Sequence, residues 1–338
     1  MNLEKKLDIL IIENPEEIYN YLQIGINLPI LCEFKEFILH DLNVFHSKSI
    51  LLLEDGDLCG HALIYFLDKN CLYFGFFRVI NDIPRRINYL ITKLIEFAKE
   101  NNFQMICGPI NIPTLIFGWG FSEKGSKDTI FLQNPSTPEI YIELFLKNEF
   151  KIYKRYFSYE GITPNLPSEL HQKLDLKDYE FFALKNWDEI DDLKESIFSL
   201  TISNLPPVSS VTPFPEKIFN NFINIAKNFF IPELFIFIRY KKNNKIIGFC
   251  FGIPNVYQKD NNGFFHSFIL YLGMIDHPHR RKGLSFKLAQ SVFNNAIQNS
   301  IFKMLGSVSA DLDMMKNYVK NFFGLKLTRK FMIFEKKI

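Results

Sequence analysis

The stretch HPHRRKGLSF, residues 277–286, gathers two His, two Arg, one Lys and one Gly immediately before an apolar segment. The apolar run 264–275 before it predicts a strand, and residues 284–298 after it repeat apolar side chains at helical spacing. The stretch is therefore a strand-to-helix turn, where a helix N-terminus presents backbone N–H groups and a partial positive charge. Because Gly283 has no Cβ to obstruct a close approach, the turn favours enclosure of a pyrophosphate. A solvated basic turn is the alternative.

The composition is typical of a chain with two soluble domains. Its 338 residues exceed one average domain, and 37 Phe supply apolar material for two cores. The formal net charge of +2 argues against a nucleic-acid partner, which requires a basic face. No apolar run reaches the roughly 20 residues of a transmembrane segment. The N-terminus is too charged for a signal peptide and the five Cys form no CxxC pair, so we expect a cytoplasmic protein with free thiols and no metal.

The order of predicted elements is similar in the two halves of the chain. Each half has a strand, a helical stretch, a hairpin, a further strand, an amphipathic helix, a strand, a last helix and a closing strand; the hairpin turns are Asp55-Gly56 and Asn243-Asn244. In the first half we expect strands at 7–12, 48–55, 58–68, 71–80, 103–108 and 151–160 and helices at 16–25, 87–101 and 139–150. In the second half we expect strands at 179–185, 233–241, 245–253, 264–275, 304–309 and 327–337 and helices at 187–200, 215–230, 284–298 and 314–323.

The two halves also align residue by residue. A shift of 195 places Ile80 on Ile275, Arg85 on Arg280 and Arg86 on Arg281, and a shift of 175 places residues 149–160 on 324–335. An ancestral duplication explains this economically; chance similarity between two Phe-rich halves is the alternative. We expect domains at 1–162 and 179–338, joined by a polar, Pro-broken linker at 163–178.

The turn at 280–285 resembles a loop of a known superfamily. Arg280, Arg281, Lys282, Gly283, Leu284 and Ser285 follow the pattern Arg/Gln-x-x-Gly-x-Gly/Ala, the pyrophosphate loop of the GNAT (GCN5-related N-acetyltransferase) superfamily. The Gly324-Leu325-Lys326 turn is similar to the Gly-Phe-Lys before that superfamily's last strand. Ser285 departs from the usual Gly or Ala, and Pro278 lies two residues before the Arg instead of three.

The resemblance implies a fold and a cofactor. It implies an α/β (α+β) fold with two tandem GNAT-like domains, each a mixed, mostly antiparallel twisted sheet flanked by helices. It also implies that the second domain binds acetyl-CoA or a longer acyl-CoA. The residues implied in this binding are Gly273, Met274 and Ile275 at the strand end and Arg280, Arg281, Lys282, Gly283, Leu284 and Ser285 in the loop.

The first half contains a degenerate copy of the loop. It reads IPRRINYL (83–90), so the arginines persist while Asn88 replaces Gly283 and Leu90 replaces Ser285. A Cβ at Asn88 points where phosphate oxygens would approach. We therefore expect a structural or substrate-shaping role for the first domain.

A second signature lies in the first half. CGPINIPTLIFGWGF (107–121), followed by Asn134-Pro135, is similar to a Gly-Pro, Gly-Phe, Asn-Pro-x-x-Tyr pattern in larger tandem acyltransferases, some of which transfer long acyl chains to amines, including bacterial ceramide-forming enzymes. The resemblance implies substrate-binding roles for Asn111 and Trp119. A stiff loop that closes a core explains the Gly and Pro equally well.

The chemistry implied by the resemblance is direct acyl transfer from a CoA thioester to the amine of a small molecule or lipid. A base must remove the amine proton, and we take His266, His279 and Asp276 as candidates. The superfamily's backbone oxyanion donor falls at Gly273-Met274, where Gly suits a bulge. Its general acid, a Tyr, falls at Lys320, so Tyr318 is the nearest candidate.

Three other functions remain open on the sequence alone. These alternatives are a non-catalytic acyl-CoA-binding protein, a long-chain N-acyltransferase of the ceramide-forming type, and a transferase that takes amino acids from aminoacyl-tRNA. The near-neutral charge counts against the last. The sequence identifies neither the acceptor amine nor the oligomeric state.

Overall fold

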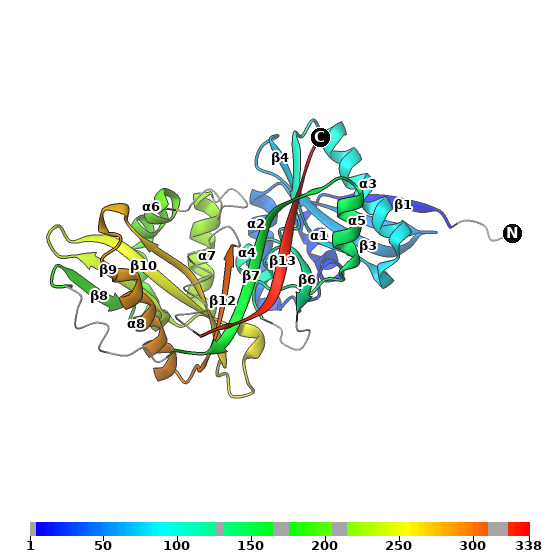
Figure 1. Ribbon diagram of the computed structural model, residues 1–338. Coiled ribbons are helices and arrows are strands. Elements are labelled where there is room, and N and C mark those ends of the chain that lie inside the picture. The colour runs from blue at the N-terminus through cyan, green and yellow to red at the C-terminus, as the bar shows by residue number, and fades with distance from the viewer. Residues whose placement is uncertain (1–4, 126–130, 165–175, 205–214, 310–323) are drawn as a thin grey trace. The chain divides into compact units, whose positions relative to one another are not determined.

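The computed structural model describes residues 5–125, 131–164, 176–204, 215–309 and 324–338 (Figure 1). The chain divides into two compact units: unit 1 contains residues 1–156 and 329–338, and unit 2 contains residues 157–328. The division differs from the expected domains at the C-terminus, because residues 329–338 belong to unit 1. Most of the expected linker, 165–175, lies outside the described residues.

Unit 1 is built on a sheet in the order β1-β2-β3-β4-β5-β13-β7, with β6 also paired to β13. Neighbours from β1 to β4 are antiparallel, β4 and β5 are parallel, and β13 is antiparallel to both β5 and β6. The strands are β1 Leu7–Ile12, β2 Lys48–Glu54, β3 Asp57–Tyr65, β4 Cys71–Val79, β5 Met105–Gly108, β6 Phe121–Gly125, β7 Lys151–Ile162 and β13 Lys326–Lys337.

The last strand explains the unexpected division of the chain. β13 pairs with β5 through Phe334 and Gly108, and Met332 and Phe334 are buried in the core of unit 1. Alternation along the strand sends these apolar side chains to the face that α3 and α5 cover. The closing strand of the sequence thus completes the first sheet.

The helices of unit 1 are α1 Pro15–Tyr21, α2 Lys35–Val44, α3 Pro84–Glu100, α4 Thr114–Phe117 and α5 Ile140–Lys147. The Asn14 side chain caps α1 by accepting hydrogen bonds from the Glu16 and Glu17 N–H groups. α3 begins at Pro84, three residues before the predicted start, because Pro at the first helical position has a suitable φ and needs no hydrogen-bond acceptor. α2 was not predicted.

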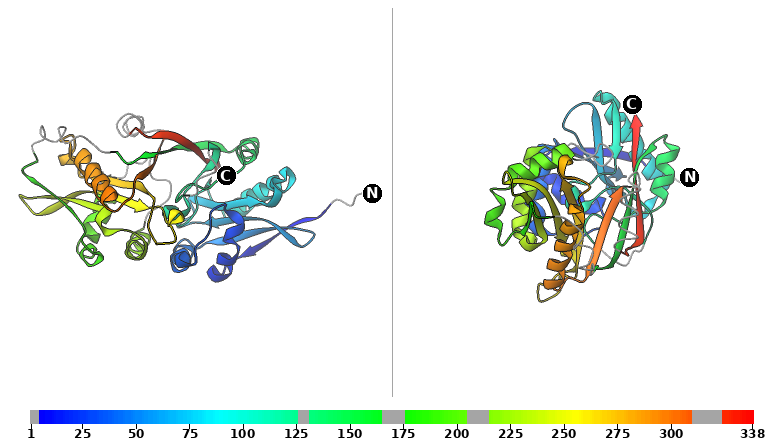
Figure 2. Two further views of the ribbon diagram at one scale, coloured as in Figure 1. Left: turned by 90° about the horizontal axis from the view of Figure 1, so that it is seen from below. Right: turned by 60° about the vertical axis from the view of Figure 1, so that its left-hand side comes forward.

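Unit 2 repeats this arrangement, with the sheet order β7-β12-β11-β10-β9-β8. Its helix α8 lies on one face of the sheet and α6 and α7 lie on the other (Figures 1 and 2). Its own strands are β8 Tyr179–Ala183, β9 Phe235–Tyr240, β10 Lys245–Pro254, β11 Ser267–Ile275 and β12 Lys303–Ser309, and its helices are α6 Lys194–Asn204, α7 Glu216–Phe229 and α8 Leu284–Gln298. The predicted helix 314–323 lies outside the described residues.

The two sheets share an irregularity at equivalent positions. In unit 2, Tyr271 is an extra residue of β11 in its pairing with β10. In unit 1, β4 has an extra residue at Phe76, whose φ is 45°. The two bulges are related by the same 195-residue shift that aligns the sequences. The predicted fold class, two mixed and mostly antiparallel sheets flanked by helices, is confirmed.

Candidate functional site

The basic stretch of unit 2 forms the turn between β11 and α8. A short 3₁₀ turn, His277–His279, follows the strand, and Arg281 has a φ of 62°. Gly283 is the N-cap of the 15-residue helix α8 and has a φ of 77°. This left-handed conformation is costly for residues with a Cβ, most of all for β-branched ones, so the backbone favours Gly at this position.

The three cations of this loop are exposed, and Arg280 and Lys282 contact only neutral groups among the described residues. Arg280 donates from Nε to the Ile275 carbonyl oxygen at 2.9 Å and from Nη2 to Asn204 Oδ1 at 2.6 Å. Lys282 Nζ donates to the Tyr179 hydroxyl at 3.1 Å. Because no described carboxylate neutralises these cations, they remain available to an anion such as pyrophosphate.

His279 packs behind the loop. Its Nδ1 lies 3.2 Å from the Tyr179 hydroxyl, and its ring contacts Tyr240 with centroids 4.7 Å apart. Burial, followed by the charge of Lys282, lowers the pKa of His279. The neutral imidazole is therefore favoured, which suits a base, while the two tyrosines hold the ring against the β8 and β9 edge.

The other two candidate bases occupy different ends of β11. Asp276 Oδ2 lies 3.5 Å from Lys245 Nζ, and Asp276 lines a cavity of about 200 Å³ together with residues of α6. His266 comes one residue before β11, is 60% exposed and faces Asp260 at 3.5 Å. A nine-residue strand separates the two ends by roughly 27 Å, so the structure does not bring His266 to the loop. Tyr318 lies outside the described residues.

The strands of unit 2 separate near the middle of β11. β11 and β12 pair in parallel only through 267–269 and 303–305. The bulge lies just beyond, at Tyr271, and the pairs Cys250–Gly273 and Phe249–Met274 are regular. The bulge was expected at Gly273 but lies two residues earlier, at Tyr271. Its position is set by the pairing of β11 with β10 and not by the presence of a Gly.

The equivalent turn of unit 1 is closed by a carboxylate. Arg86 Nη2 donates to Glu54 Oε2, and Arg85 Nη2 donates to Glu54 Oε1 at 2.5 Å. Glu54 is the last residue of β2, its side chain is 8% exposed, and the hydrogen bonds from Arg86 and Arg85 lower its pKa to about 2 against the effect of burial. The arginines that both halves retain thus bind an internal anion in unit 1.

The backbone of this turn also differs. Under the 195-residue shift Leu284 corresponds to Tyr89, yet α3 already begins at Pro84. Arg85 and Arg86 are therefore part of the first helical turn, and only the short 3₁₀ turn Ile80–Asp82 and Ile83 separate β4 from the helix. Asn88 lies inside α3 and accepts a 2.9 Å hydrogen bond from Asn148.

The separation of β4 and β5 in unit 1 is filled by the chain itself. The Phe76 N–H donates to Asn111 Oδ1 at 2.6 Å, and Asn111 Nδ2 donates to the Phe117 carbonyl oxygen at 3.0 Å. Asn111 is 4% exposed, so both polar atoms of its amide are used internally. Trp119 pairs with Ile110 and packs on Tyr156 with ring centroids 5.0 Å apart. The substrate roles predicted for Asn111 and Trp119 stay predictions.

Two residues that matter here were not foreseen in the sequence. Glu54 and Tyr240 are the last residues of equivalent hairpin strands, next to the turns at 55–56 and 241–244. A carboxylate stands at this position in unit 1 and a phenol in unit 2. An alignment of the two hairpins would have shown that Glu54 and Tyr240 occupy equivalent positions. Only the fold shows that Glu54 contacts the arginines.

Comparisons with solved structures identify the fold. The chain is similar to a tandem GNAT protein from the clavulanic acid biosynthesis pathway, with 9% identity over 98% of each chain and a TM-score of 0.62. It is similar to the glucosamine N-acetyltransferase region of a fungal multi-domain β-N-acetylglucosaminidase, with 12% identity, a TM-score of 0.67 and coverage of 99% of this chain and 38% of that one. A GCN5-related N-acetyltransferase from Sphaerobacter thermophilus shares 12% identity over 97% and 95% of the chains, with a TM-score of 0.53.

The chain therefore has the GNAT fold twice in tandem, and the resemblance found in the sequence is confirmed for the fold. No family model and no curated protein matches the sequence. Within the described ranges no helix is long and apolar enough to cross a membrane. In the same part of the chain no three His, Cys, Asp or Glu side chains gather in a way that would hold a metal ion.

Proposed function

We propose that the protein is an acyl-CoA-dependent N-acyltransferase whose CoA site lies in unit 2. The observation that supports this is the difference between two equivalent turns. In unit 1 the arginines bind Glu54, and in unit 2 Arg280, Arg281 and Lys282 meet no carboxylate among the described residues. A site that carries three unneutralised cations before a helix N-terminus suits the pyrophosphate of CoA.

The residues of unit 2 have separate tasks in this proposal. Arg280, fixed by Asn204 and the Ile275 carbonyl oxygen, holds one phosphate, and the N–H groups at the start of α8 face the other. Gly283 permits the left-handed turn that directs the chain into α8. Beyond Ile269 the backbones of β11 and β12 no longer pair with each other, which leaves room for the amide groups of the pantetheine arm. Acyl-CoA, when bound, would supply the acyl group as a thioester and leave as free CoA.

The acceptor is an amine on a small molecule or a lipid, and it must lose a proton to attack. Asp276, His279 and His266 remain the candidates for this step: Asp276 and His279 flank the loop, and His266 lies at the other end of β11. Asp276 and His279 each have a structural partner, Lys245 for Asp276 and Tyr179 for His279.

Calorimetric titration with CoA tests the site. Gly283→Val should abolish measurable CoA binding because Val is strained at a φ of 77° and its side chain narrows the turn. Asn88→Gly, the equivalent position of unit 1, should leave CoA affinity unchanged. Normal binding by Gly283→Val contradicts the proposal.

A turnover assay then tests the chemistry. Release of free CoA from acetyl-CoA and from a long-chain acyl-CoA is followed with a panel of amines. Amine-dependent release that Gly283→Val lacks supports acyl transfer. CoA binding without release from either thioester supports the non-catalytic acyl-CoA-binding protein instead.

A further inference from the structure

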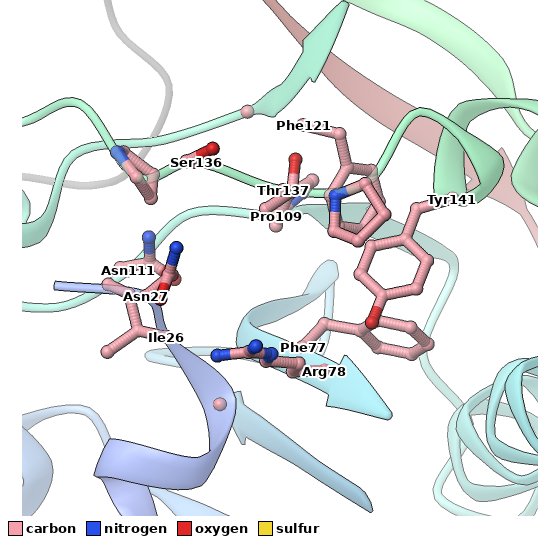
Figure 3. A pocket seen from close by; sticks show the side chains of 14 residues that line it. Ile26, Asn27, Phe77, Arg78, Pro109, Asn111, Phe121, Ser136, Thr137 and Tyr141 are labelled. Carbon is pink, nitrogen blue, oxygen red and sulfur yellow. The ribbon is translucent and has the colours of Figure 1, made fainter. Parts of the chain in front are cut away.

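We propose that unit 1 contains a binding site for a small molecule with a carboxylate group, centred on Arg78. This site is independent of the CoA site proposed for unit 2. Figure 3 shows the side chains of Asn27, Arg78, Asn111, Ser136 and Thr137 around a narrow cavity of about 20 Å³. The side chains come from four separate parts of unit 1: β4, the segment after the first helix, the loop before β6 and the loop after it.

Arg78 is the cation of this cavity. It is the next-to-last residue of β4 and is half-buried, and its guanidinium forms no hydrogen bond or ion pair among the described residues. Arg85 and Arg86, only a few residues further on, are both bound to Glu54. The nearby carboxylate of Asp82 accepts a 2.7 Å hydrogen bond from the Tyr141 hydroxyl. A half-buried guanidinium without an internal anion favours an external one.

The backbone that carries Arg78 is held rigidly by side chains of other elements. At the bulge, His61 Nδ1 lies 2.9 Å from the Phe76 carbonyl oxygen and Asn111 Oδ1 accepts from the Phe76 N–H. The Ser49 hydroxyl in turn lies 2.8 Å from His61 Nε2. These contacts fix both polar groups of the bulge residue two positions before Arg78, so the site is largely formed before a ligand arrives.

The remaining polar groups of the cavity are donors. Thr137 Oγ1 accepts a 2.7 Å hydrogen bond from the Ser122 N–H, which leaves its hydroxyl proton free to donate into the cavity. Asn27 and Ser136 add an amide N–H₂ and a hydroxyl, and no Asp or Glu lines the cavity. The lining is therefore positive and donor-rich, which selects an anionic group.

Size and shape favour a carboxylate over a phosphate. With a volume of about 20 Å³ the cavity is small, so a planar carboxylate suits it better than a larger tetrahedral phosphate. A carboxylate also matches the planar fork of a guanidinium and accepts two parallel hydrogen bonds from it. The rest of the ligand then extends out of the cavity.

Ligand-observed fluorine NMR with fluoroacetate tests the site, and fluoroacetamide serves as the neutral match. We expect fluoroacetate to bind the wild-type chain with a Kd of about 1 mM, and fluoroacetamide at least about tenfold more weakly. Arg78→Gln should weaken fluoroacetate binding at least about tenfold, and Arg78→Lys, which keeps the charge without the fork, should fall between. Arg239→Gln, an arginine of unit 2 paired with Glu180, is the control and should bind like the wild type.

Each variant is checked by thermal unfolding and by CoA titration. Retained CoA binding by Arg78→Gln shows that a loss at position 78 belongs to the carboxylate site alone. If Arg78→Gln unfolds at a lower temperature than the wild type, Arg78→Lys becomes the deciding variant. Because it keeps the cation, a folded Arg78→Lys protein must still bind fluoroacetate, and failure to bind it contradicts the proposal. Equal binding by wild type and Arg78→Gln, equal binding of the acid and the amide, or no binding to the wild type overturns the proposal.

Discussion

The Asn111 side-chain oxygen accepts a 2.6 Å hydrogen bond from the N–H of Phe76, the bulge residue of β4, across 35 positions of sequence. Asn111 Nδ2 donates to the Phe117 carbonyl oxygen, so one buried amide satisfies two backbone groups. In unit 1 this amide occupies the place where β4 and β5 separate. The first domain thus uses its own chain to close the position that corresponds to the end of the β11–β12 pairing in unit 2.

Replacement of Asn111 should therefore destabilise unit 1. Asn111→Leu leaves the Phe76 N–H and the Phe117 carbonyl oxygen buried without these partners, and we expect a loss of about 2–4 kcal/mol in the free energy of unfolding. Urea unfolding measures it. Asn43→Ala, an exposed Asn that also donates to a backbone carbonyl, should change stability by less than about 0.5 kcal/mol. Equal effects of the two substitutions would contradict the role of Asn111.

His61 should make the stability of unit 1 depend on pH. The ring is fully buried, and burial lowers its pKa from 6.5 to about 4. Because the pKa in the folded state is the lower one, stability is full above pH 6.5 and falls by about 3 kcal/mol as the pH drops to about 4. Urea unfolding at several pH values in this window checks it. His61→Gln should flatten the dependence, and the exposed His277→Gln should not.

Glu54 should make the stability of unit 1 depend on pH as well, in a lower pH range than His61. Its pKa is lowered from 4.5 to about 2 chiefly by Arg86, so its contribution is present above pH 4.5 and disappears as the pH falls through about 2. Glu54→Gln should lower the melting temperature at pH 7 by several degrees, and the difference from wild type should narrow between pH 4.5 and 2. Glu143→Gln, an exposed partner of Lys147, should have little effect at any pH. A pH-independent difference for Glu54→Gln speaks against the ion pair.

Arg280 should act on the pyrophosphate alone. Arg280→Ala should weaken CoA binding about tenfold and leave pantetheine, which lacks the pyrophosphate, unaffected. The matched control is Arg85→Ala, the equivalent arginine of unit 1, which binds Glu54 and should leave CoA affinity unchanged. Titration of both ligands against both variants separates the cases. If Arg280→Ala weakened pantetheine binding as much as CoA binding, Arg280 would not act on the pyrophosphate alone.

Local patterns predicted most of the elements. The helix 284–298 was predicted with the bounds that the structure shows, because its apolar spacing and the Gly before it are both short-range signals. The hairpins followed from their turn residues in the same way. The helix 35–44 was missed because its ten residues carry weak amphipathic periodicity. The structure places the base candidate His266 at the end of β11 away from the loop, and its role stays a prediction.

The sequence by itself determined that the chain repeats one domain and that only the second copy retains Gly at its strand-to-helix turn. Those facts are read from neighbouring residues and from two constant shifts, of 195 and 175 residues. The tertiary structure decided which turn is free to bind an anion and where the last strand pairs. Glu54 reaches Arg86 across 32 positions, and β13 reaches β5 across the length of the second domain. Such pairings depend on burial and on the register of the whole sheet, which no local pattern specifies.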